Sequence, residues 1–478
     1  MASVKKNFSL NFAYQLLSIG ISLITTPYIA RVLGAEKSGM YSYSYAIANY
    51  FLLFAMLGIN NYGNRCIAFD RDDKQKRSKT FSELYSLQVT ISLAVILVYS
   101  LYIIFLAKYK ALAIIQIIYL LSATFDINWF YFGMEKFSLT VSRNAIIKIL
   151  LTIGIFLFVK TKQDLYLYTV FMALSQLLSN LILHFFLKKY VDFKWAKLSE
   201  LKLHIKPLLV LFIPVLAISI YNIMDKIMLG YLGSATAVGY YDYSERIMQI
   251  PNAFITAVGT VMLPRMSHMA KTNSIDVIKT YINKSMNIIM FFAIGMTFGI
   301  AGVAKNLIPL FLGSEYTECI FLVQLLTPII AIKAWANVIR TQYLIPYCKD
   351  TIYVISVSLG ALANFIINLM LIPKYNAIGA VIGTIIAEIV VMLIQTICVR
   401  TEIGLKNNLM KTLLFIASGL LMYLVIITIQ NNSTGSIICL LIECLVGGGI
   451  YVLLGAITNH ALIKELIHEK GITKDKIK

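Results

Sequence analysis

Charged side chains are scarce in this sequence. Only 14% of the 478 residues are Asp, Glu, Lys or Arg, whereas 59% are hydrophobic. A soluble protein of this length needs a much larger charged surface, so this composition excludes an ordinary water-soluble fold. The mean hydropathy of +0.77 indicates that nearly all of the chain lies in lipid.

Groups that could carry out chemistry are also few. The 6 cysteines show no paired spacing of the kind that holds a metal. The polar segments are short and contain no phosphate-binding loop, metal cluster or nucleophile motif. We therefore expect no catalytic residue, no metal and no cofactor. Topology and anionic lipid headgroups account for the basic segments, so no nucleic-acid partner is expected.

Long apolar runs dominate what remains. Roughly fourteen runs of about 17 to 25 residues are each long enough to cross a bilayer as a helix. Cytoplasmic loops keep an excess of Lys and Arg, and here loops rich in basic residues alternate cleanly along the chain with loops that have few. This pattern predicts a multi-pass protein of a bacterial plasma membrane with both termini in the cytoplasm. The segments assigned to the cytoplasm are 65–79, 188–206, 265–284, 400–411 and 464–478, together with Lys5 and Lys6.

A sequence motif occurs twice, about 200 residues apart. Leu33-Gly34, Gly39 and Tyr41-x-Tyr43-Ser44 are echoed by Leu232-Gly233, Gly239 and Tyr241-x-Tyr243-Ser244. Six predicted helices separate the two copies, and an even number gives both copies the same orientation. The sequence therefore predicts two parallel repeats that are able to rock against each other.

Polar residues follow one face of the first predicted helix at steps of three and four. They are Asn11, Gln15, Ser18, Ser22 and Thr25. We expect this face to line a substrate cavity, with ordinary helix packing as the alternative. Arg31 follows the kink expected at Pro27, where it either faces the same cavity or extends to the outer interface.

Two cations share a face of the tenth predicted helix. Lys333, Asn337 and Arg340 are spaced four and three residues apart. A charge at mid-membrane costs roughly 2.5 to 3.5 kcal/mol on insertion scales, so two on one face indicate a wet cavity or a partner. We expect these three residues to bind substrate. The alternative is a structural ion pair, for example between Lys333 and Glu388.

A further group of charged residues is expected in gating or ion coupling. Asp225 and Lys226 point about 100° apart on the seventh helix, so each needs its own partner. A salt-bridge network that closes an outer gate is the preferred interpretation, with cation coupling at Asp225 as the alternative. Asp126 is placed in the fourth helix, with Arg143 and Lys148 near the fifth. The full group is Asp225, Lys226, Glu245, Arg246, Asp126 and Glu388.

Three segments resemble a known family. They are Thr26-Pro27-Tyr28-Ile29-Ala30-Arg31-Val32-Leu33-Gly34, Met224-Asp225-Lys226 before Gly230, and Pro373-Lys374-Tyr375-Asn376-Ala377-Ile378-Gly379-Ala380. The chain is similar, over residues 1 to about 400, to bacterial oligosaccharide flippases of the multidrug/oligosaccharidyl-lipid/polysaccharide exporter superfamily. The resemblance implies an all-α membrane fold of about 14 helices, in which two six-helix lobes surround a central cavity. The expected lobes are residues 1–206 and 207–405, followed by two helices and a basic tail in 406–478.

The same resemblance implies a substrate. It is an undecaprenyl-diphosphate-linked oligosaccharide repeat unit, turned outward for capsule, teichoic acid or another surface polysaccharide. A polysaccharide polymerase and glycosyltransferases are candidate partners, and the protein itself is not expected to be an enzyme. The main alternative is a cation-coupled drug or metabolite antiporter on the same fold. A membrane glycosyltransferase or polymerase is disfavoured because the external loops are short.

Overall fold

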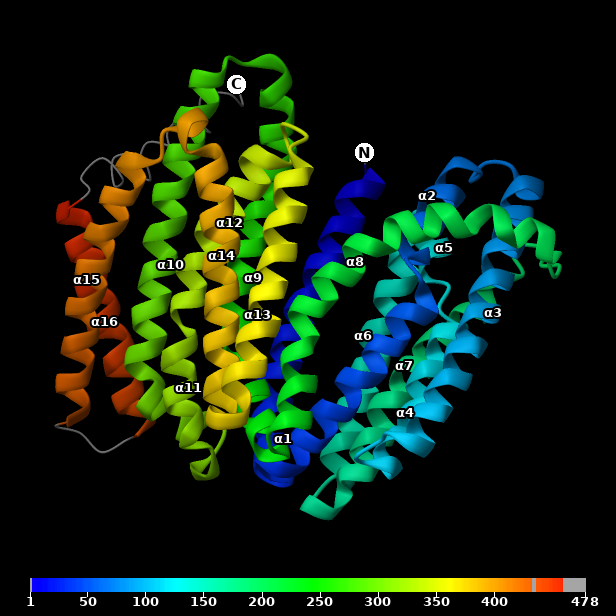
Figure 1. The fold of residues 1–478 in the computed structure, drawn as a ribbon, viewed down its shortest axis with the longest axis horizontal. Coiled ribbons are helices and arrows are strands. Elements are labelled where there is room, and N and C mark those ends of the chain that lie inside the picture. The colour runs from blue at the N-terminus through cyan, green and yellow to red at the C-terminus, as the bar shows by residue number, and fades with distance from the viewer. Residues whose placement is uncertain (1, 432–435, 459–478) are drawn as a thin grey trace. The chain divides into compact units, whose positions relative to one another are not determined.

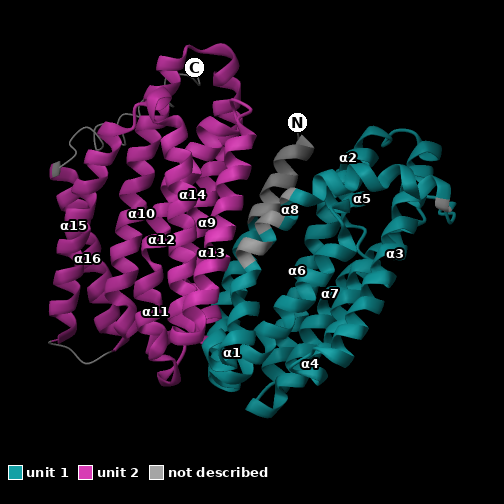
Figure 2. Cartoon of the chain, viewed as in Figure 1, with its two compact units in different colours: residues 1–239 teal, residues 240–478 magenta. Residues whose placement is uncertain are grey.

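The computed structural model describes residues 2–431 and 436–458. Within its helices, the side chains of residues 2–12, 198, 214, 217–218, 220–222 and 458 are not described. The chain forms two compact units, Met1–Gly239 and Tyr240–Lys478, coloured separately in Figure 2. All regular elements of the described residues are helical (Figure 1).

The first unit contains the helices α1 to α8. Their bounds are α1 Ala2–Met56, α2 Ile59–Phe69, α3 Lys74–Phe105, α4 Lys110–Thr124, α5 Asn128–Gly133, α6 Phe137–Phe158, α7 Leu165–Leu187 and α8 Leu198–Leu232, with a 3₁₀ turn η1 at Lys162–Asp164. Helix α4 packs against α7, and α1 packs against both α3 and α4. Asp73 precedes α3, and the N–H groups of Lys76 and Gln75 donate to its carboxylate and lower its pKa.

The second unit contains most of α9 and all later helices. The bounds are α9 Ala235–Thr272, α10 Ile275–Phe311, α11 Glu318–Leu326, α12 Pro328–Ile339, α13 Asp350–Tyr375, α14 Ala377–Ile403, α15 Lys406–Asn431 and α16 Ile437–Thr458, with short helices η2 Ser314–Tyr316 and η3 Arg340–Leu344. Helix α13 packs along α14, and α10 packs against α12 and α15.

Twelve segments of the described residues are long and apolar enough to cross a membrane. The first of them, Ala13–Phe69, bends at Gly34 and covers two of the predicted apolar runs. Helix α8, with 35 residues, covers the predicted run around Ala217. The predicted fold class, an all-α multi-pass membrane protein, is therefore confirmed.

The bend in α1 depends on a glycine. Gly34 has φ 73° and ψ 173°, a backbone conformation that a residue with a Cβ atom rarely adopts. Pro27, which the sequence suggested as the kink, lies inside a continuous stretch of the same helix. The direction of the chain therefore changes three residues after Arg31.

The two copies of the repeated motif contribute a close backbone contact within the first unit. A Cβ atom on Gly39 would lie 1.7 Å from the carbonyl oxygen of Ala235 and 2.8 Å from the nitrogen of Gly239. A Cβ atom on Gly239 would lie 2.0 Å from the carbonyl oxygen of Ala35. Only glycine permits this approach at both positions, so the two copies of the motif can pack on each other only with glycine there.

A non-helical segment, residues 191–197, joins α7 to α8 and runs along α3. Three serines of α3, each four residues apart, accept hydrogen bonds from alternate N–H groups of this segment. The pairs are Ser78 with Asp192 at 3.1 Å, Ser82 with Lys194 at 3.1 Å, and Ser86 with Ala196 at 3.2 Å. These bonds satisfy backbone donors outside a helix, and they fix where α8 begins.

The last two helices attach to the second unit partly through a buried acid. Glu443 on α16 is fully buried and accepts hydrogen bonds from Asn306 of α10 and Gln430 of α15. Tyr451 of α16 donates to the carbonyl oxygen of Phe291 at 2.7 Å. The two C-terminal helices are therefore held by polar as well as apolar contacts.

Candidate functional site

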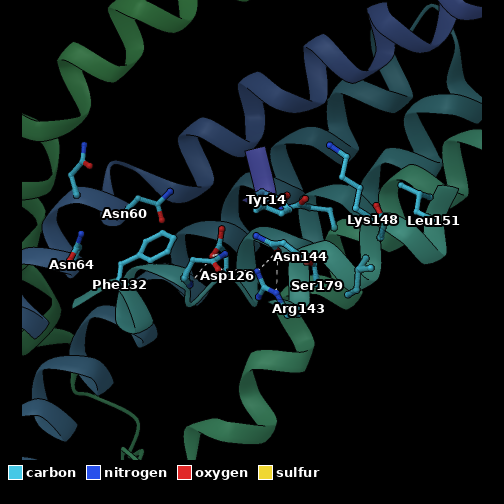
Figure 3. A pocket seen from close by; sticks show the side chains of 15 residues that line it. Tyr14, Asn60, Asn64, Asp126, Phe132, Arg143, Asn144, Lys148, Leu151 and Ser179 are labelled. Carbon is cyan, nitrogen blue, oxygen red and sulfur yellow. Dashed lines mark hydrogen bonds between the residues drawn. The ribbon is translucent and has the colours of Figure 1, made fainter. Parts of the chain in front are cut away.

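A polar cavity of about 560 Å³ lies inside the first unit. Asn60, Asn61 and Asn64 of α2 line one part of it, with Asn64 about one helical turn after the other two. Asn144, Lys148 and Leu151 of α6 and Ser175, Gln176 and Ser179 of α7 line another, again with helical spacing. In Figure 3, Asn60 and Asn64 lie on the opposite side of the view from Lys148 and Leu151.

Arg143 of α6 is the centre of a hydrogen-bond network beside this cavity. Its side chain is only 6% exposed. Its Nη2 donates to Oδ1 of Asn128 at 3.1 Å and to Oδ1 of Asn144 at 2.6 Å, and its Nε donates to the same Asn144 oxygen at 3.2 Å. Ser179 of α7 donates to that oxygen too, at 3.1 Å. The network therefore connects α5, α6 and α7 around a buried cation (Figure 3).

Asp126 also lines the cavity, but not from within a helix as predicted. Helix α4 ends at Thr124 and α5 begins at Asn128, so Asp126 lies in the short connection between them. Its Oδ1 accepts the N–H of Asn128 at 3.0 Å and the Nδ2 of Asn128 at 2.6 Å. A carboxylate that binds the backbone two residues later ends a helix and starts a turn, which explains the difference. The Asn128 amide thus connects Asp126 to Arg143.

The polar face predicted for the first helix does not line this cavity. Asn11 lies outside the described side chains. Gln15 and Ser22 are exposed, and Ser22 donates to the carbonyl oxygen of Ser18 in its own helix at 2.9 Å. Tyr14, the neighbour of Gln15, is the residue of α1 that lines the cavity. Arg31 is exposed and lies just before the bend at Gly34.

Lys333 in the second unit has the ion-pair partner that was considered as the alternative. Its Nζ lies 2.9 Å from Oε1 of Glu388 on α14, whose side chain is 6% exposed. Asn337 is buried and packs closely on α9. A Cβ atom on Gly259 of α9 would lie 2.5 Å from the Oδ1 of Asn337. Helices α12, α14 and α9 therefore meet around this polar face of α12.

Arg340 begins a π-helical turn, η3, at the end of α12. Its guanidinium carbon lies 5.4 Å from the centre of the Tyr353 ring, a cation–π contact with α13. Such turns widen a helix locally and are common at functional sites. Lys333, Asn337 and Arg340 thus lie along one helix, but Lys333 and Arg340 contact different neighbouring helices.

The predicted gating residues are divided between the two units. Asp225 of α8 is buried, at 3% exposure, and Lys226 beside it is half-buried. In the second unit, Nε of Arg246 lies 2.9 Å from Oδ2 of Asp242 on the same helix, a partner that the sequence interpretation did not consider. Glu245 is half-buried. The outer-gate network among these residues stays a prediction.

The cavity residues on α2 and α7 were missed by sequence reasoning. Asn60, Asn61 and Asn64, and likewise Ser175, Gln176 and Ser179, follow the spacing i, i+1 and i+4 within apolar surroundings. The rule that was applied to the first helix would have selected both sets. Among the described residues, no group of three or more His, Cys, Asp or Glu side chains is placed to hold a metal ion.

The helical fold and the partly open polar cavity are those of a multi-pass membrane protein of the transport class. Residues 4–270 match the family described as "Polysaccharide biosynthesis protein", and the chain belongs to this family. The resemblance to lipid-linked oligosaccharide flippases of the multidrug/oligosaccharidyl-lipid/polysaccharide superfamily is thereby confirmed.

Two of three curated relatives match most of the chain, and the third matches less than half of it. A putative O-antigen transporter of Shigella dysenteriae is 21% identical over 401 residues, which cover 83% of this chain and 100% of the relative. A putative O-antigen transporter of Escherichia coli K12 is 24% identical over 397 residues, covering 80% and 93%. The lipid II flippase MurJ of Bacillus subtilis is 22% identical over 227 residues, covering 45% and 42%.

Solved structures share the fold. The lipid II flippase MurJ in an inward closed conformation superimposes with a TM-score of 0.75 at 19% identity, over 95% of this chain and 100% of that one. An inward-facing multidrug resistance transporter of the MATE family gives 0.55 at 14% identity, over 80% and 98%. The predicted MATE-like architecture is therefore confirmed.

Proposed function

We propose that this protein translocates a lipid-linked oligosaccharide across the membrane. The observation that carries the proposal is the polar cavity of the first unit. Six amide side chains line it, from Asn60, Asn61, Asn64, Asn128, Asn144 and Gln176. Amides donate and accept hydrogen bonds at once, as sugar hydroxyl and acetamido groups require, and such a lining is costly inside an apolar helical body without a polar ligand.

The cargo is a repeat unit attached to undecaprenyl diphosphate and destined for capsule, teichoic acid or another surface polymer. The O-antigen transporters and the lipid II flippase among the relatives support this class of substrate. The glycan enters from the cytoplasmic leaflet and the lipid tail stays in the bilayer. Glycosyltransferases and a polysaccharide polymerase act before or after this step. The protein lies in a bacterial plasma membrane, with both of its termini in the cytoplasm.

Transport follows alternating access between two lobes, residues 1–206 and 207–405, with residues 406–478 as an addition. The diphosphate contacts Arg31, Lys333 and Arg340. The polar residues that face the substrate cavity beside it are Asn11, Gln15, Ser18, Ser22 and Asn337. Asp225, Lys226, Glu245, Arg246, Asp126 and Glu388 act in gating or ion coupling. Moving negative charge outward across an inside-negative membrane releases about 2.3 kcal/mol per charge per 100 mV, so no ATP is needed.

Deletion of the gene tests the proposal. We expect one undecaprenyl-linked glycan to accumulate in lipid extracts, measured by mass spectrometry, and wild type to relieve it. Arg340→Ala should not relieve it, because the loss of a charge-assisted contact of about 1.5–3 kcal/mol lowers transport roughly ten- to a hundred-fold. Lys374→Ala, at an exposed cation of the same unit, should behave as wild type. The absence of any accumulating glycan in the deletion strain would refute a flippase.

A cation-coupled drug or metabolite antiporter is the second candidate. The shared fold with the MATE transporter and the carboxylate of Asp126 in the cavity favour it. Normal lipid extracts combined with altered efflux in the deletion strain would select this function.

A further inference from the structure

The segment that joins α7 to α8 lies beside the level at which the apolar part of α3 begins. Glu83 is the last charged residue of α3, and residues 84–105 of this long apolar helix are uncharged. The N–H of Ala196 donates to Ser86, which places Trp195 close to this boundary. The segment therefore lies at the depth of the lipid headgroups, where tryptophan is enriched in membrane proteins.

The Trp195 side chain is held at the surface of the first unit. It is 67% exposed, and its ring lies edge-on to that of Phe193, with the ring centres 5.0 Å apart. Phe193 in turn contacts the ring of Tyr85 on α3, with the ring centres 5.6 Å apart. The other two tryptophans of the chain, Trp129 and Trp335, are buried. Trp195 is thus an outward-facing aromatic side chain that α3 positions.

The first turns of α8 have one face against the protein. Leu201 and Leu208 are buried there in an apolar cluster of the first unit. His204 lies between them, with Nδ1 3.0 Å from the hydroxyl oxygen of Tyr62 on α2 and Nε2 2.9 Å from Oε2 of Glu83 on α3. These contacts fix the start of α8 to α2 and α3.

The opposite face of the same turns is exposed. Its residues follow one another at helical spacing, and they are Ser199, Lys202, Leu203 and Lys206. The Leu203 side chain is 73% exposed. Figure 1 shows this first part of α8 lying across the direction of α3 and α7. A helix that lies across the spanning helices, with lysines around an exposed apolar side chain, is typical of the membrane interface.

The acidic side chains of this segment are already bound to protein groups. Asp192 pairs with Lys74 of α3 at 2.8 Å, and the carboxylate of Glu200 accepts the N–H of Lys197 at 2.8 Å. Several lysines, by contrast, are exposed and form no ion pair within the part of the chain that the structure describes. They are Lys189, Lys194, Lys202 and Lys206.

The neighbouring basic segment, residues 65–79, uses its arginines differently. Arg71 lies 2.7 Å from Oε1 of Glu135, and Nη2 of Arg77 donates to the carbonyl oxygen of Tyr190 at 2.9 Å. These two cations bind protein groups, whereas the lysines of residues 189–206 leave their positive charge at the surface. Charge complementarity therefore favours a negatively charged occupant beside Trp195 and Leu203.

We propose that residues 193–206 bind acidic phospholipids of the cytoplasmic leaflet. Trp195 and Leu203 insert among the headgroups, and the ammonium groups of Lys194, Lys202 and Lys206 contact the lipid phosphates. Each lysine near an anionic membrane surface contributes about a five-fold preference. The surface is separate from the cavity of the first unit, and its role does not depend on which molecule the protein transports.

The test uses the fluorescence of Trp195 in the full-length protein. The protein is placed in nanodiscs of phosphatidylcholine with a minor share of phosphatidylglycerol, and bromine is attached to the acyl chains of one lipid or the other. Both preparations have the same composition, so only the identity of the quenching lipid differs. The signal of Trp195 is the difference between wild type and Trp195→Phe, because Trp129 and Trp335 remain in both.

We expect brominated phosphatidylglycerol to quench Trp195 as strongly as if it were enriched about five-fold over its share of the lipid, because one lysine already provides that factor. Replacing Lys194, Lys202 and Lys206 by Gln should reduce quenching to that expected from the share of each lipid. The apolar contacts of Trp195 remain in this variant, so quenching itself should persist.

The matched control removes the same charge elsewhere. It replaces three exposed lysines outside the segment by Gln, and they are Lys160, Lys305 and Lys374. This variant should keep the preference for phosphatidylglycerol, because the preference depends on local charge.

Two results would overturn the proposal. Quenching of wild type in proportion to the share of each lipid would show that the segment does not select acidic headgroups. Quenching of Trp195 by aqueous iodide, with none by either brominated lipid, would show that the surface faces the cytosol and would leave an acidic protein as its occupant. Neither result bears on whether a lipid-linked glycan accumulates in the deletion strain.

Discussion

Two cations in the second unit, Lys333 and Arg340, show that the role of a charge inside the membrane depends on its contacts. Lys333 and Arg340 share a helix face in the sequence, yet Lys333 pairs with the buried Glu388 and Arg340 lies over Tyr353. Lys333 is thus already neutralised at rest, whereas the contact described for Arg340 is with an uncharged aromatic ring. Arg340 is therefore the better first target for a transport variant.

The Lys333–Glu388 pair makes a prediction about stability. Lys333→Ala should lower the free energy of unfolding by about 3–5 kcal/mol, because it leaves a buried carboxylate unpaired. Lys333→Ala combined with Glu388→Gln should recover most of this loss, because the uncompensated charge is gone. Thermal unfolding in detergent measures both.

The control for this cycle is the pair of the half-buried Lys279 and the exposed Asp276, whose charged atoms lie 3.4 Å apart. Its disruption should cost less than about 1 kcal/mol. If the loss of unfolding free energy in the Lys333/Glu388 double variant equals the sum of the losses in the two single variants, the two side chains do not stabilise each other. A stable double variant without transport would support a role of Lys333 in substrate binding.

Residue patterns predicted some features of the candidate site and missed others. Spacing on α12 identified Lys333 and Arg340, and the same reasoning named Glu388 as a partner, because a lysine in lipid requires one. Spacing cannot show that Asn128 stands between Asp126 and Arg143, because this contact joins α5 and α6 through a turn. The polar sets on α2 and α7 were detectable but gain meaning only when three helices bring them together.

At the scale of elements, the repeated motif acts as a packing device. Gly39 and Gly239 occupy equivalent places in the two copies, and each faces backbone atoms of the other copy. The duplication predicted from the sequence therefore has a local structural consequence that spacing alone does not reveal. A repeat identifies equivalent segments, but only tertiary structure shows that they touch.

Gly39→Ala and Gly239→Ala should each destabilise the protein by about 1–3 kcal/mol, because the added methyl group meets a carbonyl oxygen that cannot move independently. Gly20→Ala is the matched control, since nothing lies within 4 Å of a Cβ atom there. It should be neutral or stabilising by up to about 1 kcal/mol, as expected from helix propensity. A Tm for Gly39→Ala equal to that of Gly20→Ala would contradict the close contact.

At the scale of the whole molecule, hydropathy predicted the membrane class and nearly every crossing. Its main error was at boundaries, as where α4 ends at Thr124, before Asp126, and where α11, α12 and η3 divide one apolar run. In lipid every backbone N–H and C=O group must be hydrogen-bonded within the protein, so membrane-spanning helices are readily predicted from the sequence. Breaks within them depend on side chains such as Asp126 and are therefore hard to foresee.

The predicted topology can be tested with cysteine labelling in a cysteine-free background. Lys189→Cys should be protected from a membrane-impermeant maleimide in intact cells, and Lys160→Cys should be labelled, because the basic segment 188–206 is retained in the cytoplasm. Both side chains are exposed. Both cysteines should react after permeabilisation, and labelling of Lys189→Cys in intact cells would reverse the orientation.

The serines along α3 have a consequence for chain length. Four residues of a helix rise about 6.0 Å, whereas two residues of an extended chain advance about 6.6 Å, so successive pairs drift apart by about 0.6 Å. Three matched pairs are therefore close to the most that such a contact allows. A shift of the segment by one residue would also lose all three bonds together, since only alternate N–H groups face α3. The connection before α8 can consequently change its length only in steps of two residues if it is to keep its hydrogen bonds to the serines of α3. A change of one residue would break these bonds and rotate the start of α8.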